Sequence, residues 1–122
     1  RVKRPVINDT PLELPAGALE KDEDAATGAV RELLEETGIK VTNLDRFISM
    51  APISVSSTRN PNLSYIFKVD ISEKEYVNRQ PHDDEIYSVE RLAINDLAKK
   101  MASGEIYVSL TLAVLGIFLA SR

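Results

Sequence analysis

The chain has 122 residues, 43% of them hydrophobic, and a formal net charge of −4 at pH 7. This length and hydrophobic content suit a single modest core, so we expect residues 1–122 to form one domain. The negative charge argues against a polyanionic partner such as nucleic acid. The chain contains no cysteine, which excludes disulfides and thiolate metal sites, and nothing in it suggests secretion, so we expect a cytoplasmic protein.

The expected elements alternate between strands and helices along the chain. Hydrophobic alternation and capping signals predict strands over 2–7, 10–14, 41–50, 63–71 and 86–92, and helices over 24–37 and 95–102. The polar stretch 54–62, which includes Arg59, reads as a hairpin connection, or alternatively as a loop that touches a substrate. This alternation predicts the α/β class.

The C-terminal segment 106–120 is almost entirely apolar. Only Ser109, Thr111 and Gly116 among its 15 residues are not apolar. A membrane-spanning helix needs roughly 20 such residues, so no membrane partner is expected. We expect a buried helix, either against the sheet or at a contact between two copies in a homodimer.

The helix over 24–37 carries an acidic face. Glu32, Glu35 and Glu36 are three and four positions apart, which places their carboxylates on one side of a helix, within reach of one another. Seven of the 19 acidic residues lie between positions 20 and 36. Water could solvate such a face, but a hard cation such as Mg²⁺ or Mn²⁺ would also offset the repulsion, since it prefers oxygen ligands.

Residues around this face favour a cation site. Glu23 precedes Arg31 by eight positions, and a turn after Glu23 would let the two side chains pair and fix the loop against the helix. Gly38 follows the helix directly and suits a left-handed cap. Gly17 follows Pro15-Ala16 and permits a close backbone approach, so that a carbonyl can point toward the metal.

Residues 17–39 resemble the Nudix box of the Nudix hydrolases, and they match its pattern without a gap. This family hydrolyses a nucleoside diphosphate linked to another moiety. The resemblance implies the Nudix fold, an α/β/α sandwich around a mixed β-sheet. It also implies that Glu32 and Glu36 are the principal metal ligands, that Glu35 is an additional ligand, and that the Ala16 carbonyl completes the site. Glu35 and Glu36 would then be catalytic.

The residues before the box resemble one branch of the family. Arg4-Pro5 followed by the run 12–17, Leu-Glu-Leu-Pro-Ala-Gly, is similar to the ADP-ribose and nucleoside-diphosphate-sugar pyrophosphatases. That branch implies that Arg4 and Glu13 bind substrate, with the Arg4 fork on a diphosphate. Alternatively, Arg4 belongs to a solvated basic end of the chain. Ile53 after Pro52 departs from this branch, which carries glycine there.

A general base is expected in the acidic turn over 82–86. The resemblance places Glu85 at that position, and a different offset places His82 there. A metal-bound hydroxide, or a solvated turn without chemistry, are further alternatives.

Together these features predict metal-dependent hydrolysis of a small-molecule nucleotide sugar, with ADP-ribose giving AMP and ribose 5-phosphate. A different nucleotide sugar, such as a UDP- or GDP-sugar, is the alternative substrate. The alternative from a different class of function is a sensor domain that binds nucleotide sugars without hydrolysing them. Because the chain begins at Arg1 rather than Met, we expect a fragment of a longer product. Further strands, of the kind that mediate dimer contacts in this branch, would then precede it.

Overall fold

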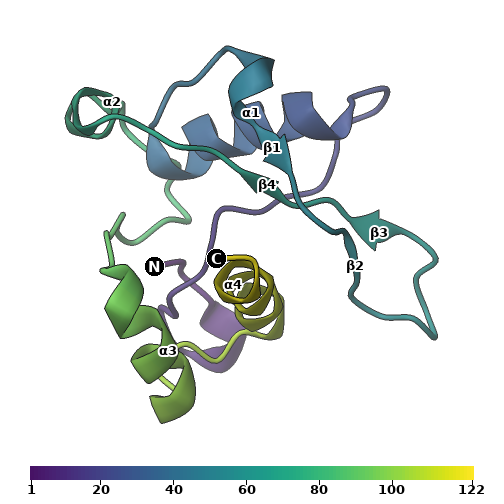
Figure 1. The fold of residues 1–122 in the computed structure, drawn as a ribbon. Helices are drawn as coiled ribbons and strands as arrows, with labels where there is room; N and C mark the ends of the chain where they lie inside the picture. The colour runs from purple at the N-terminus through teal and green to yellow at the C-terminus, as the bar shows by residue number, and fades with distance from the viewer. The chain divides into compact units, whose positions relative to one another are not determined.

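The computed structural model describes residues 1–122, which form two compact units. One unit contains Arg1–Leu14 and Asp84–Arg122, and the other contains Pro15–Asp83. In Figure 1 the first unit carries α3 and α4, whereas the second carries α1, α2 and the four strands.

The second unit is built on helix α1, Ala25–Thr37. It begins at Asp24, whose side chain accepts a hydrogen bond of 2.8 Å from the Thr27 N–H, and it ends at Gly38, whose φ is 76°. The helix starts one residue later than the predicted range 24–37 and ends at the predicted Gly38 cap, so this element is confirmed. One side of α1 packs against the buried residues Ile39, Val41 and Phe47.

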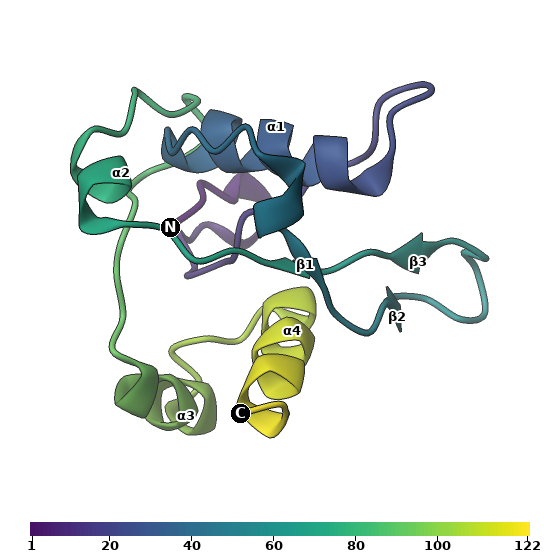
Figure 2. The same cartoon turned by 45° about the horizontal axis from the view of Figure 1, so that its top comes forward.

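The strands of this unit are short and antiparallel. Strand β1, Ile48–Ser49, pairs with β4, Phe67–Lys68, and β2, Ile53–Ser54, pairs with β3, Leu63–Ser64. Figure 2 shows β2 and β3 as a hairpin that extends away from β1, and the stretch 55–62 between them confirms the hairpin connection predicted over 54–62. The 3₁₀ turn η2, Leu44–Arg46, and helix α2, Glu73–Val77, complete the unit.

The α/β class is confirmed, but the sheets differ from the expected mixed sheet. The strands form two separate antiparallel pairs. The predicted strands 41–50 and 63–71 are each interrupted. The 3₁₀ turn η2 occupies the middle of 41–50 and leaves only β1 as strand, and the buried Ile66, whose carbonyl accepts from the Met50 N–H at 2.9 Å, separates β3 from β4. Pro52, which has no N–H to donate, then separates β1 from β2.

The first unit is mainly helical. Helix α3, Ile94–Ser103, exceeds its prediction by one residue at each end, and α4, Ser109–Ala120, is the predicted C-terminal helix with a later start. Both contribute to a core whose buried members are Leu12, Leu97, Ile106 and Leu115. None of the helices is long and apolar enough to cross a membrane.

The strands predicted in this unit are wrong. Pro5 opens the 3₁₀ turn η1, Pro5–Ile7, and Asn8 follows with a left-handed φ of 52°. The 10–14 and 86–92 stretches also form no strand; pairing is limited to isolated bridges, Val2 with Ile86 and Arg4 with Asp9. Pro5 and Pro11 remove two of the amide donors that a continuous ladder would need.

Candidate functional site

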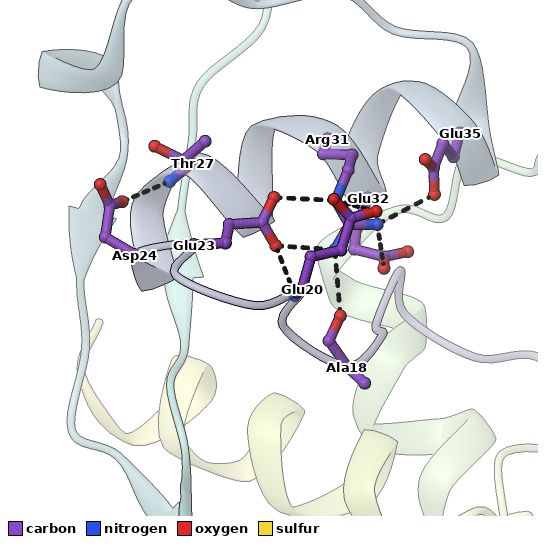
Figure 3. A network of polar contacts seen from close by, with 8 residues as sticks. All are labelled: Ala18, Glu20, Glu23, Asp24, Thr27, Arg31, Glu32 and Glu35. Carbon is purple, nitrogen blue, oxygen red and sulfur yellow. Dashed lines mark hydrogen bonds and ion pairs between the residues drawn. The ribbon is translucent and has the colours of Figure 1, made fainter.

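The Arg31 guanidinium is the centre of the polar network on α1 (Figure 3). Its Nε and Nη2 donate to the two carboxylate oxygens of Glu23, each at 2.9 Å, and Nη2 also donates to the Ala18 carbonyl at 3.0 Å. The structure thus places together the Glu23–Arg31 pair that the sequence suggested. The loop before α1 is tied to the helix by these three hydrogen bonds.

The ion pair changes the pKa of both groups. Hydrogen bonds from Arg31, followed by one from the Glu20 N–H, lower the pKa of Glu23 from 4.5 to about 2. The Glu23 carboxylate, with Glu32 as a smaller contributor, raises the pKa of Arg31. Both groups are therefore charged at neutral pH.

Arg31 also reaches two of the three predicted metal ligands. Its Nη1 donates to Glu32 at 2.8 Å and to Glu35 at 3.2 Å. The Glu32 side chain is 16% exposed, whereas that of Glu35 is 41% exposed. One nitrogen therefore lies beside two of the carboxylates on this face.

Two loop residues before α1 lie against carboxylates of the helix, Ala16 against Glu36 and Gly17 against Glu32. The Ala16 N–H donates to the buried Glu36 at 2.9 Å. The Glu32 carboxylate lies so close to Gly17 that an added Cβ would overlap it. Only glycine leaves this space for the carboxylate.

The three glutamates occupy one region but do not converge as the sequence predicted. No three acidic or histidine side chains are arranged around a common metal position. Each carboxylate instead takes a hydrogen-bond donor, Arg31 for Glu32 and Glu35 and the Ala16 amide for Glu36, because like charges repel. The donor set itself, three carboxylates on one helix, fits a hard divalent cation.

The end of the box is joined to the segment 80–83 by main-chain hydrogen bonds. Gly38 adopts its left-handed φ against the main chain of Gln80, whose N–H donates to the Gly38 carbonyl at 2.7 Å. The Asp83 N–H donates to the Glu35 carbonyl at 2.8 Å. His82 lies in this same segment, with Nδ1 3.0 Å from the Asp83 carbonyl.

The first unit contains an open groove of about 700 Å³ that brings together Arg4, Glu13 and Glu85. Arg4 donates from Nε and Nη2 to the two oxygens of Glu13, at 2.8 and 2.9 Å. Glu85 is exposed, and its carbonyl accepts from the Lys3 N–H at 2.8 Å. Because the units divide after Asp83, the two candidate bases lie in different units, Glu85 in the first and His82 in the second.

Sequence reasoning missed Lys3 and Val108 as groove residues. Lys3 adjoins Arg4, which was a usable signal. Val108 is distant in the sequence, and only the folding of the first unit places it there.

The chain is similar in sequence to two groups of curated proteins. The chain is similar to the ADP-ribose pyrophosphatase of Bacillus subtilis (strain 168), with 29% identity over 107 residues that cover 85% of this chain and 55% of that protein. It is similar to the phosphatase NudJ of Escherichia coli (strain K12), with 38% identity over 72 residues that cover 59% of this chain and 44% of that protein. The chain thus spans about half the length of the curated relatives it matches.

A sequence profile describes the family more broadly than any one relative. The profile of the NUDIX domain matches residues 2–111. This range includes α1, its preceding loop and the residues of the groove. Because the match covers most of its length, the chain belongs to the Nudix family.

Proposed function

We propose that this Nudix domain hydrolyses the diphosphate bond of a nucleoside-diphosphate sugar in the presence of a divalent metal, with ADP-ribose as the first candidate substrate. The observation that carries the proposal is the placement of Glu32 and Glu36 of α1 against the Gly17 and Ala16 loop residues. The similarity to the ADP-ribose pyrophosphatase of Bacillus subtilis supports the choice of substrate. The products would be AMP and ribose 5-phosphate.

The proposed metal ligands are Glu32, Glu35, Glu36 and the Ala16 carbonyl. A bound Mg²⁺ or Mn²⁺ would supply charge neutralisation for the diphosphate. Glu36 is the most buried of the three glutamates, since it is 7% exposed, and its carboxylate accepts the Ala16 amide. Its charge is therefore less screened by water than that of Glu35.

The proposed substrate and base residues line the groove of the first unit. Arg4 would bind the diphosphate, and Glu13 would orient Arg4 through their two parallel hydrogen bonds. Glu85 would accept the proton of the attacking water while the oxygen bonds to one phosphorus and the bond from that phosphorus to the bridging oxygen breaks. The exposure of Glu85 on the groove supports this assignment over that of His82.

Product analysis with a panel of ADP-ribose, UDP-sugars and GDP-sugars in Mg²⁺ tests the proposal. We expect AMP from ADP-ribose, no turnover in Glu36→Gln, and full turnover in Glu105→Gln, which removes an exposed carboxylate outside the site. Hydrolysis of only a UDP- or GDP-sugar would change the substrate. Calorimetric binding of ADP-ribose without product would favour a sensor, and wild-type turnover in Glu36→Gln would overturn the metal assignment.

A further inference from the structure

Arg31 has two sets of partners on opposite ends of its guanidinium (Figure 3). Nε and Nη2 bind Glu23 and the Ala18 carbonyl, which belong to the loop before α1. Nη1 binds Glu32 and Glu35, which belong to the helix. One side chain therefore joins the loop anchor to two of the proposed metal ligands.

The two ends differ in strength. The Glu23 end is bidentate, and its carboxylate is 9% exposed, so solvent screens it little. At the other end a single nitrogen is shared between Glu32, at 2.8 Å, and Glu35, at 3.2 Å with 41% of that side chain exposed. Shared and screened contacts are the weaker ones.

The charges at the second end match those of a metal site. Without a counter-cation, Glu32 and Glu35 would place two negative charges next to each other on one helix face, which is unfavourable. Nη1 supplies positive charge at that place. A divalent ion carries more charge at the same place and prefers carboxylate oxygens, so it is the stronger partner for both groups.

We propose that Arg31 Nη1 is the counter-cation of Glu32 and Glu35 in the metal-free protein, and that a divalent ion displaces this nitrogen while Nε and Nη2 remain on Glu23 and Ala18. The inference rests on the proposed metal site. Arg31 then has two effects of opposite sign. It anchors the loop, which favours the site, and it competes with the metal, which lowers the affinity.

Two substitutions that break the same ion pair separate these effects. Arg31→Gln removes both the anchor and the competing charge. Because Nη1 lies directly on two proposed ligands, we expect the loss of competition to dominate and the Kd for Mg²⁺ to fall by roughly fivefold, the equivalent of one weak ion pair. In Glu23→Gln the guanidinium loses its anchor and turns fully to Glu32 and Glu35, so the Kd should rise. If Arg31 were only a structural anchor, both substitutions would raise the Kd.

Calorimetric titration with Mg²⁺ measures these constants in the full chain. Arg46→Gln is the matched control, because Arg46 also binds one glutamate, Glu75, through two hydrogen bonds, and its further hydrogen bond goes to the Asp70 carbonyl outside the box. Its Kd should equal that of the wild type. A Kd that rises in both Arg31→Gln and Glu23→Gln overturns the inference while leaving the metal site in place.

Side-chain ¹⁵N NMR of the unmodified protein gives an answer that does not depend on how well the variants fold. On addition of Mg²⁺ the Nη1 protons of Arg31 should lose their protection from exchange, whereas the Nε proton, bonded to Glu23, should keep it. Binding of Mg²⁺ by calorimetry without a change at Nη1 overturns the inference alone. No binding of Mg²⁺ overturns it together with the proposed function.

Discussion

Gly17 lies directly against the carboxylate of Glu32, at a distance that leaves no room for a Cβ on residue 17. The obstructing atoms are the end of a flexible side chain rather than main chain. An added methyl group would therefore move the carboxylate, not unfold the loop. A loop residue thus sets the position of a proposed metal ligand on the helix.

Gly17→Ala should accordingly weaken Mg²⁺ binding and turnover with little loss of stability. We expect the free energy of unfolding to change by less than about 1 kcal/mol, since the Glu32 side chain can rotate away. Calorimetry and thermal unfolding measure the two quantities. Gly116→Ala is the control: no atom lies within 4 Å of the added methyl group in α4, so it should stabilise by about 1 kcal/mol and leave binding unchanged. A wild-type Kd in Gly17→Ala would contradict the expectation.

Gly38→Ala should be more destabilising than Gly104→Ala. Both glycines end a helix with a left-handed φ, 76° and 82°, which costs a residue with a Cβ about 1–2 kcal/mol. At Gly38 the added atom would also overlap the main-chain carbonyl of Gln80, whereas at Gly104 nothing lies within 4 Å. Urea unfolding should show an extra loss at Gly38 of about 1–3 kcal/mol. Equal losses would remove the contact with Gln80 from the explanation.

The protein should lose stability in acid below about pH 5. Hydrogen bonds from Arg46, followed by one from the Ser72 N–H, lower the pKa of Glu75 from 4.5 to about 2, and Arg31 does the same for Glu23. A lowered folded-state pKa stabilises the native state above the unfolded value of 4.5, and the contribution is lost as pH falls from there to 2. Melting temperatures between pH 6 and pH 2 measure the loss. Glu75→Gln should make that curve shallower; an unchanged slope would show that the pair does not contribute.

The two cores should unfold together, as expected of one domain. Leu115→Ala in the first unit and Ile39→Ala in the second remove side chains that are 6% and 4% exposed, and each should cost about 2–5 kcal/mol. We expect each variant to show one transition, at the same denaturant concentration by fluorescence and by circular dichroism. A second transition that appears only in one variant would show two independently folding units.

The parts of the fold that were predictable are local. Helix α1 was predicted over 24–37 with its C-cap at Gly38, because the capping signals and the hydrophobic spacing lie within 15 consecutive residues. The Glu23–Arg31 pair could be foreseen for the same reason, since the two residues are eight positions apart and a single turn joins them. The strands expected over 2–7, 10–14 and 86–92 could not be predicted from local sequence in the same way. A ladder depends on partners far along the chain, and Val2 finds only an isolated bridge with Ile86.

The sequence by itself determined the family, the helix that carries Glu32, Glu35 and Glu36, and the class of metal that suits them, because residue type and spacing within one helix are enough for these. Only the tertiary structure decided which groups those carboxylates contact. The loop returns Ala16 to Glu36 and Gly17 to Glu32, and Arg31 takes Glu32 and Glu35. It also decided that Glu85 lies beside the Arg4–Glu13 pair, because only the path of the backbone brings Glu85 to residues so far from it in sequence.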